Sequence, residues 1–335
     1  MGRLDLGALA PEPRTGKGGA PGRGGDVDEL YGWKPVGESE KRRGKRQDGL
    51  GAIPIPPFPP PELLVSSLAD VANTPPDALV AQMEKLTVRW GAKPPVLDSV
   101  DLDLFAGERL VVIGPSGAGK STILRLLSGL LLPSAGSLSI HGDEQTYLRL
   151  DQRHPPDVRL VFQNPALLAS LTVRENVGFL LYRFSKLSDR EIRERVSRAL
   201  EAVGLVGIDE LLPGELSGGM QKRVSFARAL IDDPGAAGGR VPLLLFDEPT
   251  AGLDPVACTR VEDLIVRTTE LTNASSVVVS HVISTIERCA ERVMLLYEGH
   301  FRWNGSIDEF RVTTDPYVVQ FRSGSLRGPM QPAEL

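Results

Sequence analysis

The chain of 335 residues has few cysteines and histidines and no long apolar run. Two cysteines, Cys258 and Cys289, are too few for a disulfide framework, which favours a reducing compartment. The four histidines and two cysteines lie far apart and offer no metal-ligand spacing. The apolar run around 130–132 is far shorter than the about 18 residues of a transmembrane helix, so we expect another subunit to make any membrane crossing. A net charge of −5 argues against general nucleic-acid binding, and no nucleic-acid partner is expected.

The first 75 residues are rich in glycine and proline and carry few large apolar side chains. Such a composition buries too little surface to offset chain entropy, which predicts a disordered extension over 1–75. A charged region followed by an apolar one is absent, so no secretory signal is visible. Basic residues accompany eight acidic residues in the first fifty, which neither indicates nor excludes an organellar transit peptide. The extension is therefore a candidate targeting segment.

The motif GPSGAGKST follows a strand-like apolar run at 109–113 and precedes an apolar run at 123–127 that is typical of a buried helix. This order is what a phosphate-binding loop requires, because glycine amides and a helix N-terminus can point at phosphate oxygens. Lys120 is placed to contact the β- and γ-phosphates, and the Ser121 hydroxyl to bind Mg²⁺. The structural alternative is a simple turn. The predicted nucleotide contacts are Gly114, Pro115, Ser116, Gly117, Ala118, Gly119, Lys120, Ser121 and Thr122.

A second glycine-containing motif, LSGGMQ, occupies 216–221 and is predicted to open a helix over 222–231. Two glycines and a serine at a helix N-terminus form an anion-binding concavity, far in sequence from the first loop. Its predicted contacts are Ser217, Gly218 and Gly219.

The run LLLFD at 243–247 is typical of a buried strand in a parallel sheet, and it ends in a carboxylate. Asp247 at that strand end is placed to hold hydrated Mg²⁺ opposite the phosphate-binding loop. Glu248 follows immediately and is free to orient or deprotonate an attacking water.

Three more residues have both a functional and a structural interpretation. His281 lies at the end of a strand predicted over 276–280, where ligands bind in open α/β sheets, so a γ-phosphate contact is favoured over a structural role. Trp90 lies at the tip of an antiparallel hairpin predicted over 80–105. It can stack on a nucleotide base or simply cover a sheet edge. Asp254 can cap the following helix, which is its structural interpretation.

One stretch is interpreted as packing alone. Ser188 and Glu191 form a predicted capping box, and the apolar residues that follow recur at helical spacing up to Gly204. We assign this helix to the core and give it no chemistry.

Taken in order, GPSGAGKST, Gln163, LSGGMQ, LLLFDEPTAGLD and the Ser-His pair at 280–281 resemble the ATP-binding subunits of ABC transporters. The resemblance covers about residues 78–335. It implies an α/β fold in which a RecA-like core joins an antiparallel β-subdomain and a helical subdomain over about 166–232, within a nucleotide-binding domain at 76–314. It also implies a head-to-tail homodimer that encloses two ATP molecules.

The resemblance implies ATP and Mg²⁺ as cofactors. In each site of the dimer, Lys120 and its loop come from one copy, and residues 217–219 come from the other. The remaining roles carried over are adenine stacking for Trp90, Mg²⁺ binding for Ser121 and Asp247, metal and water sensing for Gln163, general base for Glu248, a γ-phosphate contact for His281 and a place in the dimer-crossing loop for Asp254.

A finer similarity is carried by the stretch after Gln163, by residues 296–310 and by the tail from Asp315. These resemble the ATPases of the bacterial Mla phospholipid transport system and their chloroplast inner-envelope relatives in trigalactosyldiacylglycerol-type lipid import. The resemblance implies a membrane permease and an MCE-type substrate-binding subunit as partners, with the lipid handled by those partners. It implies a peripheral place on the stromal face of the inner envelope, or otherwise on the cytosolic face of a membrane.

The tail and two departures complete the comparison with the family. The tail at 315–335 is predicted to contact the other ATPase subunit, with packing on its own domain as the alternative. About seven extra residues at 235–241 are interpreted as a surface loop, because added loop length costs little. Val282 stands where many family members have aspartate, which leaves open what supports His281.

Two other functions compete with lipid transport. The first is a single-cassette soluble ABC ATPase of the iron–sulfur assembly type, or the ATPase of a different ABC importer. The second is a nucleotide-regulated scaffold without turnover. Replacing Glu248 by Gln would separate turnover from a scaffold role.

Overall fold

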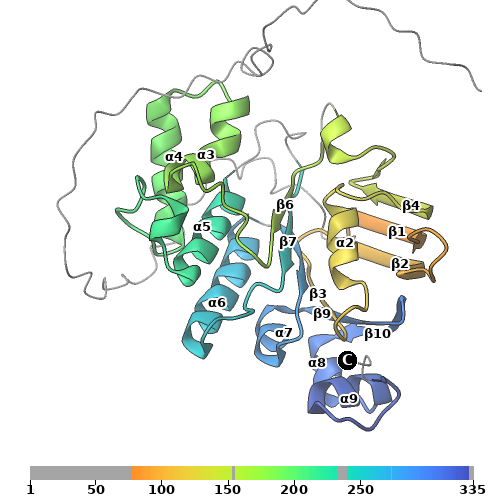
Figure 1. Ribbon diagram of the computed structural model, residues 1–335. Coiled ribbons are helices and arrows are strands. Elements are labelled where there is room, and N and C mark those ends of the chain that lie inside the picture. Colours follow the sequence, from red (N-terminus) through yellow and green to blue (C-terminus); the bar gives the residue numbers. More distant parts are fainter. Residues whose placement is uncertain (1–74, 76, 153–154, 232–239, 273, 332–335) are drawn as a thin grey trace, which may run out of the picture. The chain divides into compact units, whose positions relative to one another are not determined.

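The computed structural model describes residues 75, 77–152, 155–231, 240–272 and 274–331 (Figure 1). Except for Pro75, the extension predicted to be disordered lies outside these residues.

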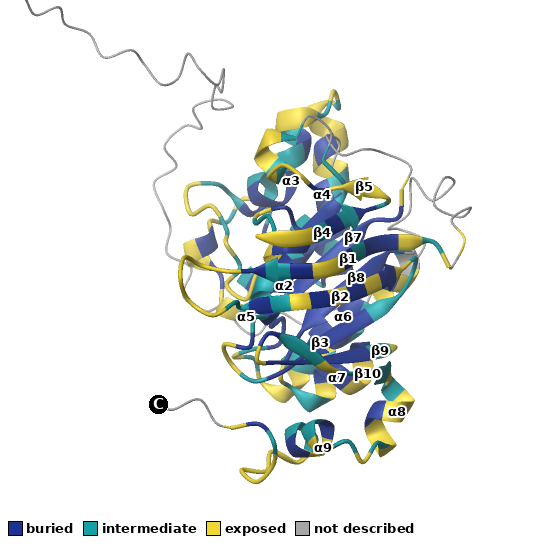
Figure 2. Cartoon of the chain, turned by 90° about the vertical axis from the view of Figure 1, so that its right-hand side faces the viewer, coloured by how far each residue is buried: buried dark blue, intermediate teal, exposed yellow. Residues whose placement is uncertain are grey.

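Six strands form a central sheet in the order β10-β9-β3-β8-β7-β6. The pairs from β9 to β6 are parallel, and β10 pairs antiparallel with β9 at one edge. A parallel sheet covered on both faces explains why β3, β7 and β8 are near-continuous apolar runs, almost fully buried (Figure 2). The strands are β3 (Arg109–Ile113), β6 (Val158–Val161), β7 (Leu243–Asp247), β8 (Ser275–Val279), β9 (Arg292–Tyr297) and β10 (His300–Ser306).

Alternation along these strands divides the core into two layers. On β3, Val111 and Ile113 pack with helices on one side, while Leu110 and Val112 pack with the antiparallel sheet and α2 (Lys120–Leu127) on the other. Figure 1 shows α2 between the two sheets. The first turn of α2, which carries Lys120, therefore follows the carboxyl end of a strand whose last four residues are buried.

The second sheet is antiparallel and has the order β2-β1-β4-β5. The predicted hairpin is confirmed, because β1 and β2 pair antiparallel from Leu79 opposite Phe105 to Val88 opposite Leu97. Its strands are β1 (Leu79–Val88), β2 (Leu97–Phe105), β4 (Ala135–Ile140) and β5 (Asp143–Glu144).

Helices α5 (Gly218–Leu230), α6 (Pro255–Thr272) and α7 (Ile283–Cys289) cover the other face of the central sheet. Helices α3 (Val173–Phe184) and α4 (Asp189–Ala202) pack on α5. Two short 3₁₀ turns are η3 (Arg149–Asp151), whose Arg149 N–H donates to Gly129 O after α2, and η4 (Pro213–Glu215). The predicted capping box of α4 is confirmed, since Ser188 and Glu191 bond to each other's backbone N–H. The prediction for α5 was wrong at its start. This helix begins at Gly218 rather than at 222, because the Ser217 hydroxyl accepts from Met220 N at 3.3 Å and caps it.

Helix α8 (Ile307–Val312) precedes the tail, and the tail, which contains α9 (Pro316–Ser323), packs on its own domain. Val318 is fully buried, the Tyr317 and Tyr297 rings lie 5.7 Å apart, and the Gln320 side chain bonds to Met330 N and O. The alternative stated for the tail therefore describes the single chain. A contact with a second copy stays a prediction.

The extra residues before β7 are described only from Arg240 onward, and 235–239 lie outside the described residues. Val241 is 1% exposed and packs in the core between the sheets, so the surface-loop prediction was wrong at that end. Arg240 pairs with Asp143 of β5. Among the helices described, none is long and apolar enough to cross a membrane.

Candidate nucleotide site

The loop after β3 is shaped by glycine backbone and by Lys120. Gly119 has φ +104 and immediately precedes α2, and Gly114 has φ +149. A Cβ on Gly114 would lie 2.2 Å from the Leu296 carbonyl oxygen, so no other residue fits there without a shift. The Lys120 ammonium donates to the carbonyl oxygens of Gly114 and Pro115, both at 2.9 Å. Lys120 therefore turns back over its own loop.

Lys120 is only 8% exposed. Burial lowers the pKa of its ammonium, and the nearby Glu248 and Asp247 carboxylates partly oppose this effect. The charge is thus held against a desolvation cost, which a bound phosphate would offset.

The loop borders a pocket of about 550 Å³. Four segments expected to share a site do meet there: the loop itself, Gln163 after β6, Glu248 after β7 and His281 after β8. The lining residues are Val96, Gly114, Pro115, Ser116, Gly117, Gly119, Lys120, Ser121, Thr122, Gln163, Glu248, His281 and Phe321.

Ser121 and Asp247 lie beside each other at the N-terminus of α2. The Ser121 hydroxyl donates to Asp247 Oδ1 at 3.0 Å. Burial raises the pKa of the Asp247 carboxyl, this hydrogen bond lowers it, and the neighbouring Glu248 charge raises it further. A divalent cation between these oxygens would relieve that electrostatic cost.

Glu248 and His281 contact each other directly. The Glu248 Oε1 and His281 Nδ1 atoms are 2.8 Å apart, and because a carboxylate can only accept, Nδ1 carries the proton in that pair. Glu248 has φ +46, a left-handed conformation uncommon outside glycine, and its N–H donates to Val279 O at 2.9 Å. Its other oxygen, Oε2, is buried without a hydrogen-bond partner among the described residues. That oxygen is free to take a proton from a water molecule.

Several predicted nucleotide contacts do not line this pocket. Trp90 is half-exposed beyond the end of β1, and Ser217 and Gly218 are exposed at the start of α5. Asp254 is exposed and accepts from Val256 N and Ala257 N at 3.0 and 3.1 Å, which is its capping interpretation. Ala118 is buried at the edge of the core instead.

The loop that carries Asp254 is nevertheless tied to the helix of the second glycine motif. Lys222 of α5 is 4% exposed, and its ammonium donates to Ala251 O at 2.9 Å. Burial lowers the pKa of Lys222, while Cys258 and Glu248 raise it. A buried hydrogen bond therefore connects α5 to the loop after Glu248.

Two lining residues were missed by the sequence reasoning. Val96 enters from the start of β2, and Phe321 enters from α9 of the tail. The predicted hairpin beside Trp90 was a usable signal for Val96. Phe321 follows the loop by about 200 positions and carries no local pattern that marks it.

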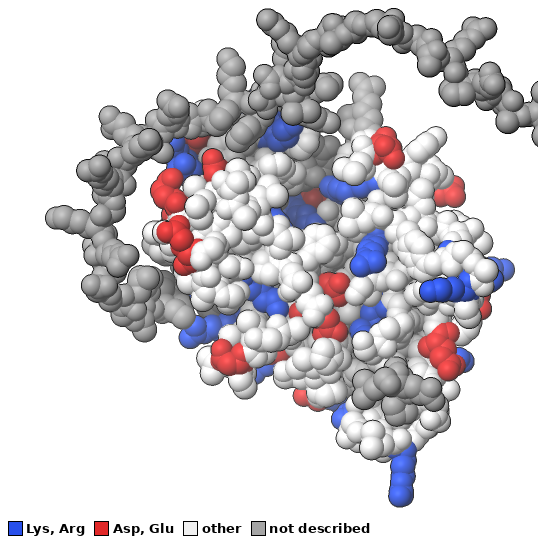
Figure 3. Space-filling model, in the orientation of Figure 1, with Lys and Arg blue, Asp and Glu red and all other residues white. Residues whose placement is uncertain are grey.

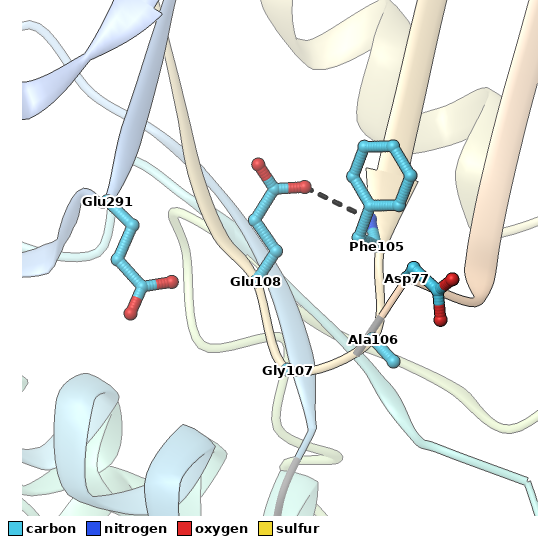
Figure 4. A pocket seen from close by; sticks show the side chains of 6 residues that line it. All are labelled: Asp77, Phe105, Ala106, Gly107, Glu108 and Glu291. Atoms are coloured by element: carbon cyan, nitrogen blue, oxygen red, sulfur yellow. Dashed lines mark hydrogen bonds between the residues drawn. The ribbon is translucent and has the colours of Figure 1, made fainter. Parts of the chain in front are cut away.

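A second hollow lies at the opposite end of β3 and carries three acidic residues, Asp77, Glu108 and Glu291 (Figure 4). Two of the three carboxylates are already paired, because Arg292 binds Glu108 and Arg109 binds Glu291 at 2.9 Å. Glu108 also accepts from Phe105 N at 3.0 Å, the dashed line in Figure 4. This hollow is held together by structural ion pairs and is not a candidate for catalysis.

The residues around the first pocket fit a magnesium nucleotide. A glycine-lined cradle, a buried ammonium, and a hydroxyl next to a carboxylate are the groups that bind phosphate oxygens and a hard cation. When bound, Mg²⁺ would neutralise charge on the transferred phosphoryl group. The chain's own residues supply a proton acceptor in Glu248 and a polar contact in His281.

A parallel sheet whose phosphate-binding loop faces a carboxylate and a histidine at its carboxyl edge defines a P-loop nucleotide hydrolase. Comparison with known proteins narrows this class, since residues 97–251 match the ABC transporter family. The chain belongs to this family as an ATP-binding cassette that hydrolyses ATP.

Two relatives illustrate the match. Protein TRIGALACTOSYLDIACYLGLYCEROL 3, chloroplastic, of Arabidopsis thaliana is 48% identical over 70% of this chain and 71% of its own. The intermembrane phospholipid transport system ATP-binding protein MlaF of Haemophilus influenzae is 34% identical over 75% of this chain and 92% of its own. The chain is thus an ABC ATPase related to lipid-transport cassettes.

Solved structures agree with this assignment. A dimeric ATP-binding cassette in a post-hydrolysis state with ADP and Pi matches with a TM-score of 0.60 and 28% identity, over 68% of this chain and 98% of that one. The predicted fold class, an α/β ABC ATPase fold with its antiparallel sheet and added helices, is confirmed.

Proposed function

We propose that this chain is the ATP-hydrolysing subunit of a multi-subunit ABC transporter that moves phospholipid or a related lipid at the chloroplast inner envelope. It would lie on the stromal face as a peripheral protein and work with a membrane permease and an MCE-type substrate-binding subunit. The similarity to the chloroplastic relative and to MlaF supports the lipid and the location.

The observation that carries the proposal is a site divided between two places. Lys120, Glu248 and His281 share one pocket, whereas Ser217 and Gly218 stand exposed on α5 outside it. The first N–H groups of a helix have no partner within the helix, so this exposed end can still bind an anion. A second copy facing head-to-tail would bring that helix end to the nucleotide, with Mg²⁺ held by Ser121 and Asp247.

A fixed surface for the permease is also supported. Asn176 is 1% exposed and makes four hydrogen bonds, to the backbone of Leu168, Leu171 and Thr172. These bonds hold the stretch after Gln163, in which Leu168 is 46% exposed. The exposed Leu168 side chain, on a backbone held close to Gln163, is suited to contact a helix of the permease.

On the face shown in Figure 3, acidic and basic side chains are interspersed and do not form a large patch of one sign. This distribution favours recognition through shape and apolar contacts over binding to a polyanion.

The test of the catalytic part is Glu248→Gln. We expect ATP hydrolysis to fall by two orders of magnitude or more, because the proposed proton acceptor is lost, while ATP-dependent dimerisation measured by light scattering persists. A rate equal to that of the unchanged protein would remove Glu248 from the role of base.

The test of the transport part is affinity isolation of the full chain from envelope membranes. We expect a polytopic permease, an MCE-type subunit and bound lipid to accompany it. Isolation with a soluble assembly machine, or with a permease and no lipid, would contradict lipid transport and leave the ATPase in place.

A further inference from the structure

Glu248 and His281 lie on neighbouring loops that are joined a second time, behind the pocket. The Thr250 and Thr285 hydroxyl oxygens are 2.9 Å apart, and these residues are 2% and 0% exposed. Thr250 comes two residues after Glu248, and Thr285 lies in α7, which begins two residues after His281. Water does not reach this bond, so its loss would leave buried groups without partners.

The bond continues to a buried carboxylate on α6. The Thr285 hydroxyl lies 2.8 Å from Glu262 Oε1, and the Ser284 hydroxyl lies 2.9 Å from the same oxygen. Glu262 is fully buried, and Arg288 Nε lies 3.2 Å from its other oxygen, Oε2. Two hydroxyl donors and one guanidinium charge therefore face one carboxylate.

The donor inventory gives the chain of hydroxyls a direction. A hydroxyl has one proton, and Thr285 gives its proton to the Glu262 carboxylate, which can only accept. Thr250 must then donate to Thr285. The order is Thr250 to Thr285 to Glu262, ending on a charge, and such a series strengthens each of its bonds.

The Glu248–His281 contact alone cannot keep the two loops together during turnover. Under the proposed function, on which this inference rests, Glu248 turns to a water molecule and His281 to the γ-phosphate. A phosphate contact made through His281 Nδ1 would break their 2.8 Å bond, whereas Glu248 can take a water proton on Oε2 without breaking it. Val282 follows His281 and has no polar side chain that could take over the bond to Glu248. Its backbone N–H donates instead to Ser280 Oγ at 3.1 Å.

We infer that Thr250, Thr285 and Glu262 are positioning residues for ATP hydrolysis. Their buried bridge fixes the spacing between the general-base loop and the histidine loop while the Glu248–His281 contact opens. They touch neither nucleotide nor water, and act through the loops they join.

The test uses the full chain and compares two hydroxyl deletions on the same network. Thr250→Val removes the bridge with little change of shape, and Thr250→Ser keeps it. Ser284→Ala is the matched control, because it removes a bond to the same Glu262 oxygen without touching Thr250. Thermal unfolding and steady-state ATP hydrolysis are measured for each variant.

We expect Thr250→Val to lower kcat about tenfold with KM for ATP within about twofold, and Thr250→Ser to stay near the unchanged protein. Ser284→Ala should lower Tm without this loss of kcat. Equal kcat losses in Thr250→Val and Ser284→Ala, or an unchanged kcat in Thr250→Val, would overturn the inference. Should Thr250→Val not fold, Thr250→Ala makes the same deletion with a smaller side chain.

A double-mutant cycle separates positioning from general loss of stability. In a His281→Ala background, Thr250→Val should add little further loss, because the group it positions is gone. Additive losses would contradict the inference. Glu248→Gln separates the positioning role from the proposed function. If Glu248→Gln abolishes turnover and Thr250→Val leaves kcat unchanged, the positioning role is refuted and the proposed function stands.

Discussion

Arg228 of α5 offers a sharp test of how the loop after Gln163 is held. Its guanidinium donates from Nη1 to Ala166 O at 2.9 Å and from Nη2 to Pro165 O at 3.2 Å. Ala166 has φ +48, in the left-handed region that is unfavourable for residues other than glycine. We infer that Arg228 holds the loop in this strained form. We predict that Arg228→Met releases the loop, since methionine keeps the apolar stem and removes both donors.

The magnitude follows from the contacts. Hydrogen bonds to a charged group contribute about 1.5–3 kcal/mol each. Ala166 is exposed, so water can replace part of what its carbonyl loses. Burial also lowers the pKa of Arg228, and removing the charge recovers that cost. We therefore expect a total loss of about 1.5–3 kcal/mol in unfolding free energy, and at least about a tenfold loss in kcat as Gln163 moves.

Arg223 on the same helix provides the matched control. It donates to the carbonyls of Val203 and Gly204, away from the pocket, and burial lowers its pKa as well. Arg223→Met should lower Tm comparably and leave kcat within about twofold in ATPase assays run below both melting temperatures. Similar kcat losses in both variants, or full activity in a destabilised Arg228→Met, would refute the reasoning.

Two further predictions concern the phosphate-binding loop and its metal site. Burial raises the pKa of Asp247, so the folded chain holds more protons than the unfolded one between the two pKa values, and the stability of the nucleotide-free protein falls as pH rises through that window. Asp247→Asn should therefore raise its unfolding free energy at neutral pH by about 0.5–2 kcal/mol while abolishing Mg²⁺-dependent hydrolysis; a lower Tm would contradict this. Gly114→Ala should lower the Tm of the nucleotide-free protein far more than Gly117→Ala. A Cβ at Gly114 would lie 2.2 Å from the Leu296 oxygen, whereas a Cβ at Gly117 would meet nothing within 4 Å. Equal melting temperatures would contradict the stated clash.

The parts of the site that the sequence predicted are those built from contiguous residues. Local rules describe three features, each of which depends on a few neighbouring positions. They are the turn from β3 into α2, the carboxylate at the end of β7 and the capping of α6 by Asp254. The start of α5 was placed four residues too late, at 222, although the cap at Ser217 allows both glycines inside the first turn of the helix.

Local sequence patterns could not predict the strand order, although the family resemblance implied that these residues share a site. Glu248 and His281 meet because β7 and β8 are adjacent and parallel, and the loop with Lys120 joins them because β3 is the other neighbour of β8. Long segments separate these strands, so no periodicity encodes the order. Phe321 and Val241 were missed for the same reason, since their burial depends on distant partners.

The resting geometry gives a physical reason why one copy should hydrolyse ATP poorly. In the single chain Glu248 is held by His281 at 2.8 Å, and Ser217 at the helix end is exposed and does not line the pocket. A phosphate between two copies would attract that helix end and also compete for His281, which frees Glu248 Oε1 in addition to Oε2. Dimer closure and activation of the base would then be one event. The buried bridge from Thr250 to Glu262 is what would keep the two loops aligned while the exchange takes place.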